Sequence, residues 1–194
     1  TNLVQPSTGT TLTLGASGDT VDVPSGATLD VTGATVTGLS AGKVLQVVSA
    51  NKTDTASTTS TTFVTTGLEV TITPSATSSK IFIIATANLG HLMDNTMGAC
   101  ILRDSTELNL ADAAGSRMRA GSNIQYQYGS YNTDSFPMTY LDSPSSTSAI
   151  TYKVAYKCRG YLSQSIYINR GNGDTDADYY GRSSSTITVM EIEG

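Results

Sequence analysis

The sequence predicts an all-β fold, an antiparallel β-sandwich of jelly-roll type preceded by a short-strand repetitive stalk. Its 194 residues include 31 Thr, 24 Ser, 18 Gly and no Trp, a composition that disfavours helices and suits strands and turns. Apolar and polar residues alternate over short runs, as in half-buried strands. Turns rich in Gly, Pro, Ser and Asp separate these runs. These three observations exclude a helical bundle.

Residues 1–42 are predicted to be the stalk and the oligomerisation segment. They contain no Lys, no Arg and no aromatic residue, and their short alternating runs are separated by turns. Each run has one narrow apolar edge, which a single copy would leave in water, so we expect three identical chains to wind about one axis as a homotrimer. The alternative is a flexible linker rich in Gly, Thr and Ser. In the trimer the inward-facing residues are Leu12, Leu14, Val21, Val23, Leu29, Val31 and Val36.

Residues 43–194 are predicted to form the sandwich, a head domain with longer strands. The last strand alternates cleanly, with Ile187 and Val189 on one face and Met190 and Ile192 on the other, and we expect it inside the sheet. The expected strands are 43–50, 61–66, 68–73, 80–88, 97–103, 106–110, 124–128, 136–141, 149–158, 164–169 and 186–193.

Charge and hydropathy exclude two classes of partner. The net charge is −5, and the 11 Lys and Arg residues are scattered, so no basic stripe is present to neutralise nucleic-acid phosphates. No apolar run approaches the roughly 20 residues that a membrane-spanning helix needs. We therefore expect neither nucleic-acid binding nor membrane insertion. The chain begins with Thr1, which is typical of a processed chain or of a segment of a longer protein.

No catalytic arrangement is recognised in the sequence, and we expect a non-enzymatic protein. A Gly-x-Ser-x-Gly elbow is absent, and the single histidine, His91, is expected to be solvated or to cap a loop. Paired carboxylates of a glycan hydrolase stay open, because Asp and Glu occur in many loops. Cys100 and Cys158 lie in strand-like runs and are expected to be small core residues, the alternative being a cross-strand disulfide.

One acidic run alternates Asp174, Asp176 and Asp178, whose oxygens could converge on Ca²⁺. The Glu and the turn Gly of the helical calcium loop are missing. A solvated hairpin tip, or a loop whose Asp residues pair with Arg170 and Arg182, is the favoured interpretation. No cofactor is expected, with Ca²⁺ as the minority alternative.

Tyrosines indicate a binding surface, since all ten lie between Tyr126 and Tyr180. Tyr126 and Tyr128 have the same parity on one expected strand, and Tyr131 follows closely. Phenol rings can stack on sugar faces and donate hydrogen bonds, so these three are the candidate receptor-binding residues. The alternative is that they close the end of the sandwich or pack between subunits.

Six runs carry a resemblance to a known family: Gly42–Val48, Leu68–Pro74, Leu141–Pro144, Thr151–Val154, Tyr167–Arg170 and Ser185–Ile192. They resemble a domain found in structural proteins of marine tailed bacteriophages, including cyanophages and pelagiphages. The runs occur in the same order as in that family, and the resemblance covers residues 42–194. It implies a virion protein, usually a fibre or fibre-like appendage on the particle surface, and it carries no catalytic residues.

Two functions follow as hypotheses. The first is the distal, receptor-binding part of a tail fibre, whose loops 89–96, 111–135 and 170–182 attach to a host-surface glycan or protein. The second is a capsid decoration or head fibre that only assembles with other virion proteins. A receptor-binding tip should expose aromatic residues on loops far from the stalk, whereas a scaffold should bury them in subunit contacts.

Overall fold

The computed structural model describes residues 22–28, 42–91, 96–125, 131–159 and 164–194, and it divides the chain into two units, Thr1–Leu39 and Ser40–Gly194. In the first unit, Ala27 N donates to the carbonyl oxygen of Pro24 at 3.0 Å across a turn at Ser25–Gly26. Val23 is 43% exposed in this single chain. The other predicted stalk residues lie outside the described residues: Leu12, Leu14, Val21, Leu29, Val31 and Val36.

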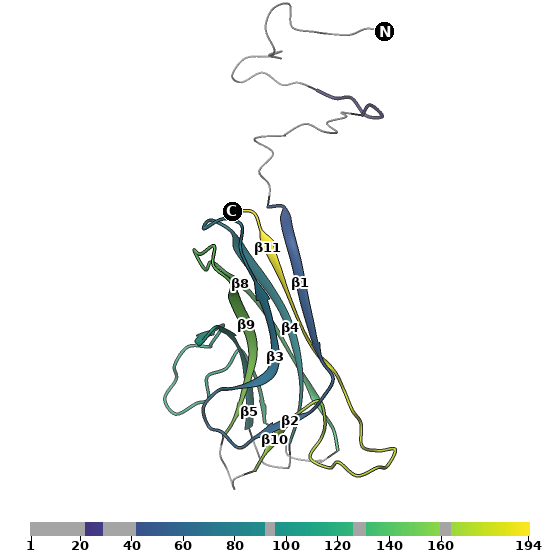
Figure 1. The fold of residues 1–194 in the computed structure, drawn as a ribbon. Helices are drawn as coiled ribbons and strands as arrows, with labels where there is room; N and C mark the ends of the chain where they lie inside the picture. The colour runs from purple at the N-terminus through teal and green to yellow at the C-terminus, as the bar shows by residue number, and fades with distance from the viewer. Residues whose placement is uncertain (1–21, 29–41, 92–95, 126–130, 160–163) are drawn as a thin grey trace, which may run out of the picture. The chain divides into compact units, whose positions relative to one another are not determined.

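The second unit is an antiparallel β-sandwich, which confirms the predicted fold class (Figure 1). Its chain crosses repeatedly between the two sheets, for example from β3 to β4 and from β8 to β9. The first sheet has the order β1 (Val44–Lys52), β11 (Ser185–Ile192), β4 (Lys80–His91), β10 (Ile166–Ile168) and β2 (Ala56–Thr58), with β8 (Asp134–Asp142) also paired to β4. The second has the order β3 (Val64–Ile72), β9 (Ile150–Cys158), β5 (Thr96–Arg103) and β6 (Thr106–Leu108), with β7 (Ser122–Gln125) paired to β5. None of the described residues belongs to a helix of the length and apolarity that a bilayer span requires.

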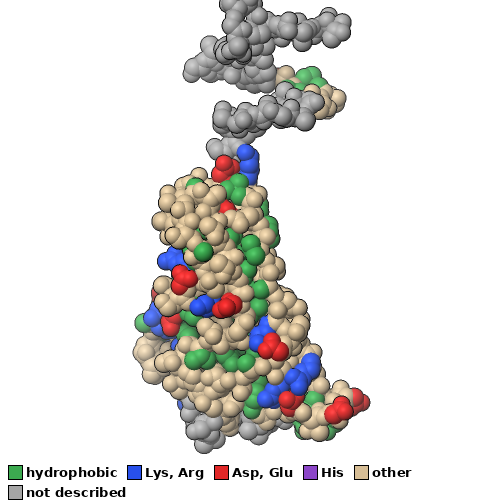
Figure 2. Space-filling model, viewed as in Figure 1, with side chains coloured by type: hydrophobic (Ala, Val, Ile, Leu, Met, Phe, Trp, Pro, Cys, Tyr) green, Lys and Arg blue, Asp and Glu red, His purple; other side chains and the backbone are tan. Residues whose placement is uncertain are grey.

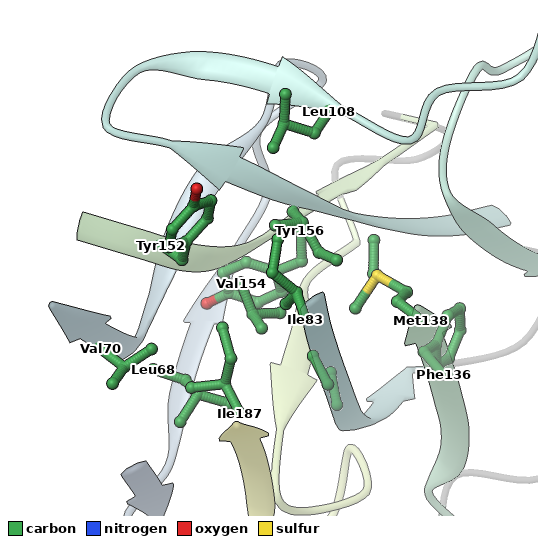
Figure 3. Close-up of a cluster of buried hydrophobic side chains, with 14 of the residues drawn as sticks. Leu68, Val70, Ile83, Leu108, Phe136, Met138, Tyr152, Val154, Tyr156 and Ile187 are labelled. Carbon is green, nitrogen blue, oxygen red and sulfur yellow. The ribbon is translucent and has the colours of Figure 1, made fainter. Parts of the chain in front are cut away.

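The core lies between the sheets and receives alternate side chains from both (Figure 3). Ile83 and Ile187 enter from the first sheet, while Leu68, Tyr152 and Tyr156 enter from the second. All five are at most 1% exposed. At about 1.5–3 kcal/mol for each large apolar side chain buried, this layer is the main stabilising feature of the domain.

Strand β11 lies between β1 and β4, as the sequence predicts. Ile187 and Val189 are buried, whereas Met190 and Ile192 lie on the outer face and are partly exposed. The pairing with β4 is regular, and the pairing with β1 shifts register once, between Val44 and Gln46, so β11 connects the edge strand β1 to the rest of the sheet.

The expected strands 61–66 and 68–73 are one strand, β3, which is a correction to the sequence-based prediction. Gly67 has a φ of +83° and lies where the pairing of β3 with β9 shifts register between Thr65 and Glu69. A glycine with positive φ can mark a bulge within a strand as readily as a turn between two. The three-residue strand β2 was not predicted.

The histidine prediction is wrong in its position. His91 is the last residue of β4, pairs with Ile166 of β10 and is 3% exposed, so it is neither solvated nor in a loop. The cysteines are free and buried, as expected of small core residues. Burial raises the pKa of Cys100 to about 12, which keeps this thiol protonated at neutral pH.

Candidate functional site

The site is built on a long excursion of the chain between β10 and β11. Both strands pair with the same edge of β4, because β8 occupies the other edge. Ile168 lies opposite Leu89, and Thr186 lies opposite Thr86. The two partners are close together on β4, yet the chain uses residues 169–185 to connect β10 to β11. This segment, residues 169–184 before β11, projects from the sheet and is named the excursion loop; it is drawn in yellow-green in Figure 1.

Asn169 fixes the point where the excursion loop leaves the sheet. It is fully buried and has a left-handed φ of +63°, a conformation that asparagine tolerates better than most residues. Its Nδ2 donates to the carbonyl oxygens of Lys52 at 2.8 Å and Asp54 at 2.9 Å. Its Oδ1 accepts from Oγ of Ser185, at the other end of the loop, at 2.6 Å. One side chain therefore joins both ends of the loop to the end of β1.

Gly90 allows a second segment to reach the excursion loop. A Cβ at this position would overlap the carbonyl oxygen of Arg170 and lie 2.7 Å from Cα of Gly171 and 2.9 Å from the carbonyl oxygen of Asn132. The segment before β8 and the start of the excursion loop therefore meet above a residue without a side chain. Asn88, two residues earlier, accepts from Oγ of Ser135 at 2.6 Å on the β8 side.

Three tyrosines meet where these segments converge, and Tyr131, Tyr179 and Tyr180 are named the tyrosine cluster. The ring centroids of Tyr131 lie 5.4 Å from Tyr179 and 5.1 Å from Tyr180, both in edge-on geometry. The rings of Tyr179 and Tyr180 are 4.7 Å apart. Tyr131 is nevertheless 47% and Tyr179 60% exposed. Edge-on packing holds the rings in place while leaving aromatic surface in contact with water.

Ion pairs hold the excursion loop from within. Asp174 pairs with Arg182 and, at 3.8 Å, with Nε of Arg170. The Arg170 guanidinium lies over the ring of Tyr167, 3.8 Å from its centroid, and donates to the carbonyl oxygens of Gly171 and Asn172. Asp174 therefore has the arginine partners that the sequence favoured for this acidic run.

The proposed Ca²⁺ ligands do not converge in the described part of the chain. Asp176 and Asp178 are exposed, and the described residues contain no group of three or more His, Cys, Asp or Glu side chains placed to hold a metal ion. With Asp174 already paired to two arginines, nothing in the geometry of this loop adds support for a cation.

A shallow pocket adjoins the tyrosine cluster, with a volume of about 380 Å³. The polar groups of its lining residues are an amide, three hydroxyls, a carboxylate and a guanidinium, which together both donate and accept hydrogen bonds. The excursion loop, which supplies part of the lining, is marked by red acidic side chains in Figure 2. The pocket is lined by Tyr131, Asn132, Thr133, Asp178, Tyr179, Gly181 and Arg182.

A second hollow, of about 650 Å³, lies at the ends of β5 and β9. Its lining includes Arg117, Lys157 and Arg159 and no acidic residue, so it is locally positive in a chain of net charge −5. The Lys157 ammonium lies 4.1 Å from the ring centroid of Phe63 and is thus partly engaged. The lining of this hollow contains no aromatic residue, unlike that of the pocket beside the tyrosine cluster.

The sequence identified one member of the cluster and missed two. Tyr131 is in the cluster, whereas Tyr126 and Tyr128 lie outside the described residues. Tyr179 and Tyr180 were not singled out, although the loop 170–182 that carries them was a candidate. The signal available was an exposed Tyr-Tyr pair in a loop rich in Gly and Asp; the roles of Gly90 and Asn169 had no sequence signal.

No protein-family model and no curated protein matches the chain. Among solved structures, it is similar to the VP2 subviral particle of infectious bursal disease virus, with a TM-score of 0.40 and 9% identity over 76% of this chain and 39% of that one. It is also similar to T=1 particles derived from infectious bursal virus, with a TM-score of 0.37 and 11% identity over 76% of this chain and 39% of that one. The chain thus spans about two-fifths of the length of these proteins, and a likeness this distant says nothing about function.

Proposed function

We propose that this chain is a non-enzymatic fibre protein of a phage virion, whose head domain attaches to a glycan on the host surface through the tyrosine cluster. The observation that carries the proposal is an exposed cluster of three aromatic rings beside a pocket with mixed hydrogen-bonding groups. Exposed aromatic patches of this kind are typical of binding surfaces.

The position of the cluster suits a tip. The chain enters the domain at β1, where Val44 lies opposite Ile192, and β1 ends at Lys52, opposite Ser185. The excursion loop ends immediately before Ser185, so its base lies at the far end of β1. At about 3.3 Å per residue, this is about 25 Å from the entry point. Exposed aromatic residues at the end of the domain opposite the entry of the chain favour a receptor-binding protein over a scaffold.

The chemistry of the pocket favours a sugar. The C–H faces of a pyranose pack on tyrosine rings, and its hydroxyls need both donors and acceptors. Asn132 offers both, Asp178 accepts and Arg182 donates, and all three line the pocket with the rings. The acidic loop disfavours a nucleic acid, whose phosphates need cations.

The proposed virion location and homotrimer are supported by the sequence and not by the tyrosine cluster. The resemblance of several runs to structural proteins of marine tailed phages supports a position on a particle surface, together with other virion proteins. The alternating stalk of residues 1–42 favours three chains about one axis. The second hypothesis, a capsid decoration or head fibre with an assembly role only, would leave the tyrosine cluster without a ligand.

The test measures binding of the full chain to surface polysaccharide purified from the host. Tyr131→Ala combined with Tyr179→Ala should weaken binding at least tenfold, since each aromatic contact in an interface can contribute about 1–2 kcal/mol. Tyr179→Phe keeps the ring and should bind nearly as the parent does, and Thr71→Ala, on the other sheet, is the matched surface control. Unchanged binding by a correctly folded double alanine variant would favour the scaffold hypothesis.

The same incubation tests the absence of catalysis. The polysaccharide should keep its length, because the sequence presents no activated nucleophile. Depolymerisation that disappears when one Asp or Glu is replaced would overturn the non-enzymatic part of the proposal.

A further inference from the structure

An apolar row crosses the outer face of the first sheet. Val47 of β1 lies opposite Met190 of β11, Met190 opposite Phe82 of β4, and Phe82 opposite Leu141 of β8. Side chains at paired positions point to the same side of a sheet, so these four form one continuous line across four strands. Val47 is 57% and Leu141 50% exposed. Figure 2 shows green side chains reaching the surface along the strip where Figure 1 draws β1 and β11.

The same outer face is almost free of charge. Ile84, in the next row, is 40% exposed, and Ile192 lies at the end nearest the entry of the chain. Among the outward positions of the four strands, Lys80 is the one charged residue, at the edge of the apolar rows. These outward positions are Val44, Leu45, Val47, Ser49, Asn51, Lys80, Phe82, Ile84, Thr86, Asn88, Ser135, Pro137, Thr139, Leu141, Thr186, Thr188, Met190 and Ile192.

The outer face of the second sheet differs in both respects. Glu69 and Lys153 form a cross-strand pair there, and Lys157 lies on the same strand as Lys153. Its apolar outward residues Cys100, Leu102 and Ala155 are covered by Phe63 and Leu110. One sheet therefore has the charged and covered exterior of a water-facing surface, whereas the other has a nearly uncharged exterior with an apolar row that the described residues of the chain leave uncovered.

We infer that the outer face of the first sheet packs against the same face of other copies of this chain, and that this contact joins the heads of the trimer. An uncharged face suits a partner identical to itself, because in a symmetric assembly any charge near the axis would meet its own copies. The face also begins at β1, whose first residue, Val44, is separated by Lys43 alone from the segment predicted to trimerise. The inference rests on the trimeric part of the proposed function and not on glycan binding.

The size of the face explains why the stalk is needed. Four strands spaced about 4.8 Å apart and about 25 Å long present roughly 400–500 Å², apolar and polar positions together, which is below the roughly 800 Å² per partner of a stable interface. Such a face associates weakly by itself. Chains already joined by residues 1–42 would hold their heads at an effective concentration in the millimolar range, at which a weak apolar contact forms.

Distances between spin labels in the full chain test which face points inward. A label on Val47→Cys reports the first sheet, and a label on Thr71→Cys reports the exposed outer face of the second; Cys100 and Cys158 are buried and should not react. Because the sheets lie about 10 Å apart, the distance between subunits should be shorter for position 47 than for position 71 by at least about 15 Å. Equal or reversed distances, or no dipolar signal between chains, would overturn the inference.

A charged variant gives a second readout that does not depend on labels. Val47→Asp combined with Leu141→Asp places carboxylates on residues that are already half exposed, so the isolated sandwich should still fold. The apparent dissociation constant from sedimentation over a dilution series should rise at least tenfold, while Thr71→Asp leaves it unchanged. Equal constants for the two variants would overturn the inference. If the parent protein is monomeric but still binds glycan, the inferred contact between heads is wrong, and the proposal of glycan binding is unaffected.

Discussion

Nε2 of Gln46 donates a hydrogen bond to Oε2 of Glu191 at 2.6 Å, across the pairing of β1 with β11. The other carboxylate oxygen, Oε1, accepts from N of Ser75 at 2.7 Å and from the hydroxyls of Ser75 and Ser79 at 2.6 and 2.7 Å. Glu191 is 1% exposed. A single carboxylate therefore joins both sheet strands to the turn between β3 and β4.

Acid should destabilise the domain through Glu191. Burial alone would raise the pKa of this carboxyl, but the hydrogen bonds from Ser75, Gln46 and Ser79 outweigh it and lower the pKa to about 2. A carboxyl whose pKa is lower in the folded than in the unfolded state stabilises above its unfolded pKa and loses that contribution as pH falls. The loss should occur between pH about 4.5 and 2, with an upper limit of about 3 kcal/mol that solvent screening reduces.

The measurement is the free energy of unfolding from denaturant titrations at several pH values. Glu191→Gln should be less stable at pH 7 and should show a flatter dependence between pH about 4.5 and 2. Glu69→Gln, an exposed substitution on β3, is the control and should follow the parent. An unchanged acid dependence in Glu191→Gln would show that other groups dominate.

Alkali should act on the buried pair Tyr152 and Asp142. The Tyr152 hydroxyl donates to Oδ2 of Asp142 at 2.6 Å, and Nη1 of Arg103 donates to both carboxylate oxygens at 2.9 and 3.0 Å. Burial, and then the hydrogen bond to Asp142 and its charge, raise the pKa of Tyr152 well above its usual value. Since the folded pKa exceeds the unfolded one, this stabilisation is complete below pH about 10 and is lost as pH rises.

Tyr152→Phe separates the hydrogen bond from the ring. It should lower the free energy of unfolding at pH 7 by about 1–2 kcal/mol and reduce the loss of stability above pH about 10. Burial also raises the pKa of Tyr156, to about 12, so part of the alkaline dependence should persist. Denaturant titrations at pH 9, 10 and 11 measure the free energy of unfolding of parent and variant, with the exposed Tyr179→Phe as the control. The same alkaline slope in Tyr152→Phe and the parent would contradict the assignment.

Gly90→Ala should disturb the tyrosine cluster without touching it. The added Cβ would press on the backbone of Arg170, Gly171 and Asn132, none of which can rotate away as a side chain could. We expect a loss of about 1–3 kcal/mol and faster tryptic cleavage after Arg170 and Arg182. Gly181→Ala, whose Cβ would meet nothing within 4 Å, is the matched control for stability. Parent-like stability and proteolysis in Gly90→Ala would mean that the two segments are not held together there.

The sandwich was predictable from the sequence, but the cluster was only partly so, for a physical reason. Alternation is local and shows directly which residues of β11 face the core, hence the correct faces for Ile187 and Met190. The contact between Tyr131 and Tyr179 depends instead on two segments meeting above Gly90, and no local pattern reports such a meeting. The parity rule placed Tyr126 and Tyr128, which lie outside the described residues, on one face of a strand, and it gave no sign that Tyr179 and Tyr180 of a distant loop contact Tyr131.

Removal of residues 185–194 should abolish folding, because β11 is the strand that connects β1 to β4. Its loss would leave the inner edges of both neighbours without partners for their backbone N–H and C=O groups, and such groups are costly when buried. It would also remove Ile187 and Val189 from the core and Glu191 from its four donors. Deleting only Glu193 and Gly194, which follow β11, is the control and should yield soluble protein. Circular dichroism and denaturant unfolding of both truncations test this prediction, since a soluble 1–184 chain with a cooperative transition would mean that the sheet tolerates the loss of this interior strand.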